Sequence, residues 1–395
     1  MVARPWRLPE WCWPVAGAVL LLLLQLLSPH EAAAAALAGW DVYLFIGGMM
    51  LLAELARREG LFDWLAAHAV TWAAGSTTRL FAIVYAVGVV VTVFMSNDAT
   101  AVVLTPAVAA AVRQAKAKPL PHLFACAFVA NAASFALPIS NPANLVIYDG
   151  ELPGLLEWAR VFGLAALAAV LATFAALRFA FRHELTGHTE APAVPPLSLE
   201  GRIAAVAVFA SAFVLLAASA LRWPLGPPAC GVALAGVVAV GIAQRKWQGP
   251  LLREVSWTSL LLVAGLFVVV RALESTGALA VVSRLAASGE GRGFAALASF
   301  VTALACNLMN NLPAGMLAAS ALSAAHAGPG VRDAVAIGID LGPNLTIIGS
   351  LSSVLWLLAV RREGIAVDGW RFLRVGLLAT PLAMAAALAL LGLRA

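Results

Sequence analysis

Apolar stretches of membrane-spanning length follow one another along most of the chain. A helix needs about 20 mostly apolar residues to cross the hydrocarbon core of a bilayer. The stretches that fit are 11–27, 40–56, 121–148, 157–181, 202–220, 225–243, 256–272, 331–358 and 370–392. Two more, 80–112 and 293–323, are too long for one span and carry a polar cluster at their centre. The pattern predicts an all-α polytopic membrane protein with nine spans and two re-entrant hairpins.

The two polar clusters are expected to meet at a substrate site. The first contains Ser96, Asn97, Asp98 and Thr100, and the second contains Asn310 and Asn311. Amide and carboxyl groups at membrane depth are costly unless they line a cavity enclosed by protein. Paired interruptions of this kind are typical of transporters that bind their substrate near the bilayer midplane. We therefore expect the serine, threonine and asparagines of both clusters to contact the substrate.

Each half of the chain contains a second interruption. Pro138 and Pro142 must open the helix at 121–148, because each proline removes a backbone donor and clashes with the preceding turn. Gly342, Pro343 and Gly349 interrupt 331–358. The polar residues that we expect to reach the substrate here are Ser140, Asn141, Asn144, Asn344, Thr346 and Ser350. The alternative is that such residues only join helices by hydrogen bonds.

Asp98 and Asp340 are the only carboxylates in these four interruptions. An acidic residue inside a membrane is by default a candidate for function. We therefore predict proton coupling for both, with helix capping as the alternative role of Asp98.

An internal repeat relates the two halves. Trp40, Gly48 and Gly60 recur 217 residues later as Trp257, Gly265 and Gly277, whereas Asn97 and Gly163 recur 213 residues later as Asn310 and Gly376. The units are 1–181 and 202–395, joined by the polar linker 182–201. Each unit contains one hairpin and one broken helix. The charge pattern places the start of 40–56 outside and that of 256–272 inside, so the repeats are predicted to have inverted topology.

Composition and charge agree with a membrane protein. Hydrophobic residues make up 62% of the chain and charged residues 11%, against about 25% charged residues in soluble domains. The net charge of +5 follows topology and calls for no nucleic-acid partner. The loops rich in Lys and Arg lie on one face of the nine-span arrangement, which predicts a cytoplasmic N-terminus and an external C-terminus. We expect 11–27 to be a retained span, although it also resembles a cleaved signal peptide.

Several classes of protein are disfavoured by the motifs. The four cysteines have no CxxC spacing, so neither a disulfide framework nor a metal site is indicated, and no cofactor is expected. Neither HExxH nor GxSxG occurs, which favours a transporter over a membrane enzyme. No GxxxxGK[ST] loop is present, so energy is expected from an ion gradient or a separate ATPase.

The interruptions also carry a family resemblance. The segments 94–106, 137–145, 310–313 and 340–351 resemble the arsenite/antimonite efflux permeases (ArsB type) of the ion-transporter (ArsB/NhaD) superfamily. The resemblance extends over nearly the whole chain from about Trp11. Asn344 stands where that branch often has lysine, Ile347 where several relatives have proline, and longer members have one more N-terminal span. A sodium/proton antiporter and a carboxylate transporter of the dicarboxylate or citrate type therefore stay open.

The resemblance implies a substrate, a coupling ion and a location. The substrate would be arsenite or antimonite, an uncharged trihydroxide at neutral pH, exported across the bacterial cytoplasmic membrane in exchange for protons. Amides, hydroxyls and open carbonyls suit such a solute, and no Lys or Arg lies within the four interruptions. Cys306 lacks electropositive neighbours, so we do not expect it to ligate arsenic. Optional partners are an ATPase subunit and a second copy of the chain in a homodimer.

Overall fold

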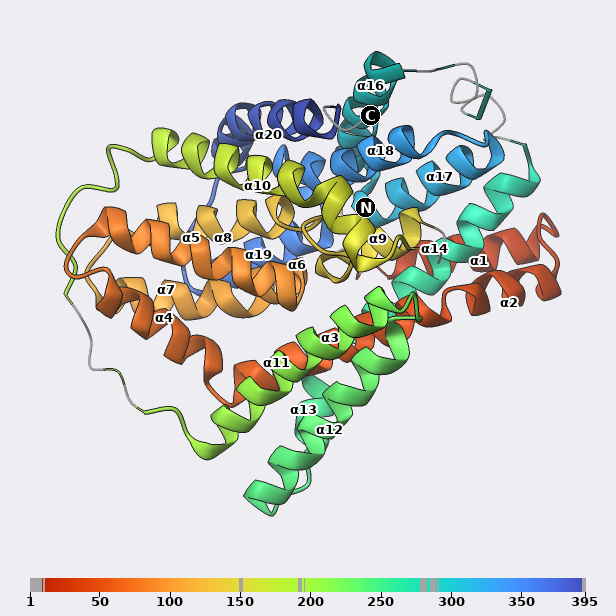
Figure 1. Ribbon diagram of the computed structural model, residues 1–395. Coiled ribbons are helices and arrows are strands. Elements are labelled where there is room, and N and C mark those ends of the chain that lie inside the picture. The colour runs from red at the N-terminus through yellow and green to blue at the C-terminus, as the bar shows by residue number, and fades with distance from the viewer. Residues whose placement is uncertain are drawn as a thin grey trace.

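The computed structural model describes residues 9, 11–148, 152–190, 194, 196–277, 283–284, 289 and 291–392. The secondary-structure elements that these residues form are all helices (Figure 1). The prediction of an all-α membrane protein is therefore confirmed. Among the described residues seven helices are long and apolar enough to cross a membrane. They are α5 (Thr77–Phe94), α10 (Leu155–Ala180), α11 (Leu199–Ala220), α12 (Gly226–Gln244), α14 (Thr258–Ser275), α16 (Gly291–Met309) and α20 (Gly369–Gly392).

The described residues form fewer helices of spanning length than the nine spans predicted, and the difference arises in specific segments. An eighth span results if α2 (Pro29–Ala38) and α3 (Trp40–Arg58), which meet at 48°, cross as one. The predicted span 11–27 is helical only as α1 (Cys12–Leu23), since Ser28 and Glu31 form a capping box that starts a new helix at Pro29. The predicted spans 121–148 and 331–358 are each divided into short pieces.

Both predicted hairpins contain a sharp reversal at the polar cluster. After α5 come α6 (Asn97–Ala99), a π-helical turn (Thr100–Leu104) and α7 (Thr105–Gln114). In Figure 1 α6 lies at the inner end of α5, and α5 and α7 both pack on α8. In the second half α16 is followed by α17 (Asn311–Ala324). One leg of each hairpin, α5 or α16, is itself of spanning length.

The broken helices have closely similar designs. The first comprises α8 (Pro119–Ala132), a 3₁₀ turn at 138–140 and α9 (Pro142–Ile147). The second comprises α18 (Pro329–Leu341), 3₁₀ turns at 342–344 and 347–349, and α19 (Leu351–Arg362). The residue before α9, Asn141, has φ −149° and ψ 130°, and the residue before α19, Ser350, has φ −141° and ψ 158°. Both residues accept a hydrogen bond from the helix they precede.

Packing between the halves is also reciprocal. Gly48 of α3 lies against Ala229 of α12, and Gly265 of α14 lies against Pro14 of α1, each too closely for a side chain. The equivalent helices α3 and α14 thus each pack on a helix of the opposite half. These matches support an internal repeat, while the inverted orientation of its two units stays a prediction.

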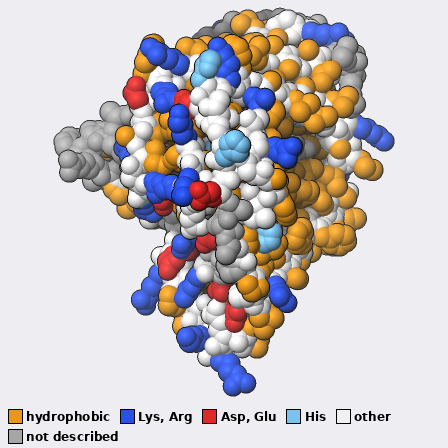
Figure 2. All heavy atoms as spheres, turned by 90° about the vertical axis from the view of Figure 1, so that its left-hand side faces the viewer, with side chains coloured by type: hydrophobic (Ala, Val, Ile, Leu, Met, Phe, Trp, Pro, Cys, Tyr) orange, Lys and Arg blue, Asp and Glu red, His pale blue; other side chains and the backbone are white. Residues whose placement is uncertain are grey.

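Charged residues gather at one end of the molecule. Figure 2 shows Lys, Arg and His side chains concentrated on the face where α5 begins and α10 ends. The described part of the linker packs on this end: Thr189 N–H donates to the Gly75 carbonyl at 3.0 Å, and Glu190 N–H donates to the Ala115 carbonyl at 3.1 Å. The amphipathic helices α4 (Leu61–Trp72) and α13 (Gly249–Glu254) complete the fold.

Candidate functional site

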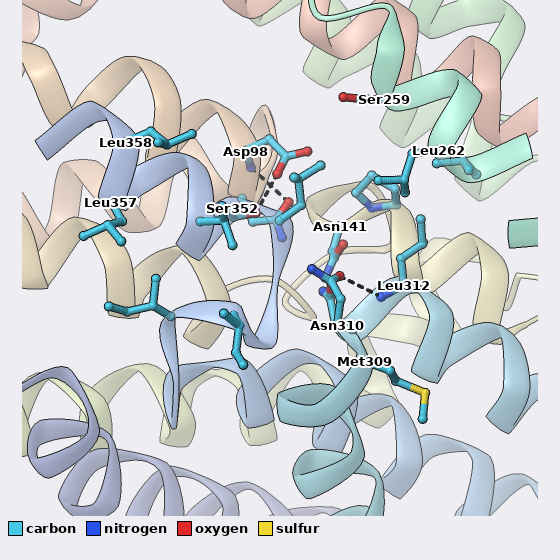
Figure 3. A pocket seen from close by; sticks show the side chains of 18 of the residues that line it. Asp98, Asn141, Ser259, Leu262, Met309, Asn310, Leu312, Ser352, Leu357 and Leu358 are labelled. Atoms are coloured by element: carbon cyan, nitrogen blue, oxygen red, sulfur yellow. Dashed lines mark hydrogen bonds between the residues drawn. The ribbon is translucent and has the colours of Figure 1, made fainter. Parts of the chain in front are cut away.

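A cavity of about 230 Å³ lies where the two hairpin turns meet the broken helices (Figure 3). Five predicted site residues line it: Asn97, Asp98, Asn141, Asn310 and Asn311. They come from α6, the first helix break and the turn before α17, which are far apart in the sequence. Apolar side chains of α3, α14, α17 and α19 form much of the remaining wall, including Ile46, Leu262, Leu312 and Leu357. The cavity therefore combines neutral amides, one carboxyl group and an apolar surround.

Asp98 is the carboxyl group in this cavity, and its partner is a hydroxyl. The Ser352 hydroxyl donates to Asp98 Oδ1 at 2.6 Å, from the second residue of α19 (Figure 3). No Lys or Arg forms an ion pair with Asp98 among the described residues. The contact joins the first hairpin to the second broken helix, and both of its residues line the cavity.

The cavity wall extends to one cation, Arg361. Arg361 lies nine residues after Ser352 on α19, a rise of about 13 Å along the helix. Its side chain is exposed. The following residue, Arg362, is also exposed and does not line the cavity. The helix breaks contain no Lys or Arg. The positive charge of the cavity wall comes from Arg361, which lies beyond the second break.

Four predicted binding residues of the hairpins and first break bond to other protein groups and do not line the cavity. Ser96 accepts from the Ala99 N–H, and Thr100 bonds to Thr92 at 2.8 Å. The Ser140 hydroxyl donates to the Val93 carbonyl at 3.0 Å. Asn144 donates to the Ser134 carbonyl at 2.9 Å. For these side chains the structure favours the alternative of hydrogen-bonded joints between segments.

Three predicted residues of the second break behave in the same way. Asn344 donates to the Phe128 carbonyl at 3.0 Å, and the Thr346 hydroxyl donates to Asn307 Oδ1 at 2.6 Å. Ser350 donates to Asn131 Oδ1 at 3.2 Å. Asn344 and Ser350 satisfy polar groups at the crossing of the two broken helices, and Thr346 satisfies one on α16, where an unpaired group would be costly.

Asp340 is separated from the cavity. Its side chain is fully buried at the end of α18, and Asn141 Nδ2 donates to its Oδ1. Asn141 itself lines the cavity, so the amide stands between the Asp340 carboxyl group and the site. The sequence predicts the same role for Asp98 and Asp340, but in the structure only Asp98 lines the cavity.

Sequence reasoning missed Ser352 and Asn131. Ser352 is one of three serines among the four residues that follow Gly349, and this cluster of hydroxyls was the available signal. Asn131 is a single amide within an apolar span, which by itself marks an intramembrane polar site. It donates to Asn344 Oδ1 at 2.9 Å and to Ser353 Oγ at 3.2 Å.

The described residues offer no cluster of three or more His, Cys, Asp or Glu side chains that could hold a metal ion. Cys306 is fully buried between α16 and α18, with its thiol directed at the Ile339 carbonyl, 3.8 Å away. It does not line the cavity.

Comparison with known proteins relates the chain to membrane transporters. The family described as "Citrate transporter" (CitMHS) matches residues 8–359. The arsenical pump membrane protein of Escherichia coli (strain K12) is 28% identical over 401 residues, covering 96% of this chain and 92% of that one. That of Yersinia enterocolitica is 28% identical over 377 residues, covering 90% and 86%. An uncharacterized transporter of Mycobacterium tuberculosis is 28% identical over 405 residues, covering 96% and 92%.

A solved structure has the same fold. The YdaH transporter of Alcanivorax borkumensis aligns with a TM-score of 0.58 at 14% identity, covering 97% of this chain and 98% of that one.

Proposed function

The chain belongs to the citrate transporter (CitMHS) family and is a secondary membrane transporter, and we propose that it exports arsenite or antimonite in exchange for protons. The names of the relatives from Escherichia coli and Yersinia enterocolitica support the substrate. The observation that carries the proposal is the cavity at the hairpin turns, in which four amides accompany a single carboxyl group.

The chemistry of this cavity suits an uncharged trihydroxide. Asn97, Asn141, Asn310 and Asn311 offer both donors and acceptors, which match a solute that has hydroxyls on every side. Asp98 and Arg361 are the charged side chains among the described lining residues, so most of the surface that meets the solute is neutral. The amides therefore bind, and the apolar wall excludes bulk water around the bound solute.

Asp98 is the proton carrier of the proposal. It shares the cavity with the substrate and has a hydroxyl partner, so it can gain or lose a proton without breaking an ion pair. Protonation weakens Asp98 as an acceptor for Ser352, because hydrogen bonds to an ionised group are the stronger ones. Protonation of Asp98 would therefore weaken one of the contacts between the first hairpin and α19, which also packs on α6 and α7.

Location and energy supply follow from the same proposal. We place the charged end of Figure 2 in the bacterial cytoplasm, with the N-terminus inside and the C-terminus outside. Proton exchange supplies the energy, and an ATPase subunit is an optional partner.

Transport by vesicles tests the proposal. Everted membrane vesicles containing the protein are expected to accumulate arsenite when acidified inside, and a protonophore is expected to abolish accumulation. Vesicles with the Asp98→Asn variant are the matched control. Accumulation that is indifferent to the protonophore contradicts proton coupling, and an absence of arsenite accumulation in vesicles that contain folded protein contradicts the substrate.

A second candidate, carboxylate transport, is favoured by one observation. Arg361 gives the cavity wall a cation that an uncharged solute does not need, and cations pair readily with carboxylates. Citrate and dicarboxylates added in excess to the arsenite assay separate the two. Competition, or uptake of labelled citrate, favours the carboxylate. A requirement for sodium in place of a proton gradient favours sodium coupling, as in a sodium/proton antiporter.

A further inference from the structure

The two broken helices are held together by a pair of equivalent contacts. Asn131 precedes the first break and Asp340 precedes the second, 209 residues apart. Asn141 and Ser350, which begin the helices after the breaks, are also 209 residues apart. Asn131 Oδ1 accepts from the Ser350 hydroxyl at 3.2 Å, while Asp340 Oδ1 accepts from Asn141 Nδ2. Each half thus supplies an acceptor to the other half's helix start.

The backbone supports this equivalence. Leu137 and Thr346, again 209 residues apart, have φ −130° and ψ 156°, and φ −138° and ψ 154°. Each is followed by a three-residue 3₁₀ turn and then by Asn141 or Ser350. The four side chains of the two contacts are at most 3% exposed. Their geometry therefore comes from the same local fold used twice.

The two contacts differ in chemistry and in what they border. Asn131 also uses its Nδ2, which donates to Asn344 and Ser353. The matching atom of Asp340, Oδ2, is buried and has no hydrogen-bond partner among the described residues. Asn141 lines the cavity, whereas Ser350 does not. Only the contact made by Asp340 therefore acts directly on the site.

We propose that Asp340 is a positioning residue that holds the Asn141 amide toward the cavity, and that the exchanged proton is carried elsewhere. This inference rests on the proposed transport function and refines it, since it leaves Asp98 as the single carboxyl group that meets the substrate. Asn141 Oδ1 is occupied by the Ala143 N–H at 3.0 Å, so the orientation of its Nδ2 depends on the acceptor that Asp340 supplies.

Substitutions that keep or remove this acceptor provide the test. Asp340→Asn retains an oxygen acceptor, as Asn131 does in the other half, and is expected to preserve the pH dependence of exchange with a change in KM within about threefold. Asp340→Ala leaves the buried Asn141 amide unpaired, and we expect an increase of about tenfold or more in KM. Loss of the pH response in folded Asp340→Asn protein would overturn the proposal, because it would make Asp340 a proton site.

A measurement without substrate tests the contact between Asp340 and Asn141 independently of the proposed transport function. Thermal unfolding of the purified protein is compared for Asn141→Ala, Asp340→Ala and their double variant. Asn131→Ala, Ser350→Ala and their double variant form the matched set. We expect each double variant to be clearly less destabilised than the sum of its singles, as for residues in contact. Additive losses would contradict the contact even if wild-type protein transports arsenite. Coupling without any arsenite transport would contradict the substrate and leave the contact in place.

Discussion

At the scale of single residues, the contact between Asp98 and Ser352 has the most direct consequence for transport. Asp98→Asn keeps size and hydrogen bonding but removes the titratable group, so exchange is expected to stop or to lose its response to pH. Ser352→Ala removes a hydrogen bond to a carboxyl group, which is worth about 1.5–3 kcal/mol, and should alter the pH response without abolishing it. Flux in vesicles over a range of pH checks both. An unchanged profile for Asp98→Asn would exclude this carboxyl as the proton site.

Arg361 allows a second test at the same scale, with its neighbour as control. Arg361→Gln removes the only cation that the described residues contribute to the cavity wall, whereas Arg362→Gln removes a charge from the same helix end outside the cavity. For an uncharged trihydroxide we expect both variants to keep KM within about threefold of wild type, since no ion pair with the solute is lost. A selective increase in KM for Arg361→Gln would indicate that the bound substrate is an anion.

At the scale of elements, the second hairpin turn depends on an unusual backbone at Asn310. Its φ of 80° and ψ of 154° lie in a region nearly restricted to glycine, which costs other residues about 1–3 kcal/mol. Asn310→Gly should therefore keep or raise the thermal unfolding midpoint while it weakens transport. Both variants lose the bond from the Leu312 N–H, but alanine keeps the backbone strain that glycine relieves, so Asn310→Ala should weaken both. Equal midpoints for the two variants would contradict this account of the turn.

The packing of α16 on α18 gives a further prediction about elements. A Cβ atom at Gly338 would lie 2.1 Å from the Ser299 carbonyl oxygen of α16, whereas a Cβ atom at Gly330 has no heavy atom within 4 Å. Gly338→Ala is expected to destabilise the protein by about 1–3 kcal/mol through overpacking. Gly330→Ala, on the same helix, should be neutral or slightly stabilising. Thermal unfolding of the two variants is the measurement, and equal stability would contradict the close approach.

Elements were more predictable from the sequence than the directions of their side chains. Proline and glycine pairs located both helix breaks, and the hairpin turns fell at the predicted asparagines, because these residues act on the backbone locally. Whether a polar side chain faces the cavity or a neighbouring carbonyl depends on contacts between distant segments. Asn141 and Asn144 are three residues apart, yet only Asn141 lines the cavity. No local pattern distinguishes Asp98 from Asp340 for the same reason.

At the scale of the whole molecule, the relation between the two halves determines which side each hairpin enters from. Reciprocal packing of α3 on α12 and of α14 on α1 fits two units of one design, and the charge pattern predicts that their topology is inverted. An inverted pair places the start of the first hairpin in the cytoplasm and the end of the second outside. Ala74, before α5, and His326, after α17, are both exposed and mark these two positions.

Labelling of single cysteines decides between inverted and parallel halves. In a background with Cys12 and Cys230 replaced by alanine, the remaining Cys126 and Cys306 are buried and out of reach of a polar reagent. A membrane-impermeant thiol reagent should then label Ala74→Cys only in inside-out vesicles and His326→Cys only in right-side-out vesicles. Lys246→Cys, exposed after α12, is the control for the cytoplasmic face. Labelling of positions 74 and 326 from the same side would make the repeats parallel, and the two hairpin turns would then have to reach the shared cavity from one face.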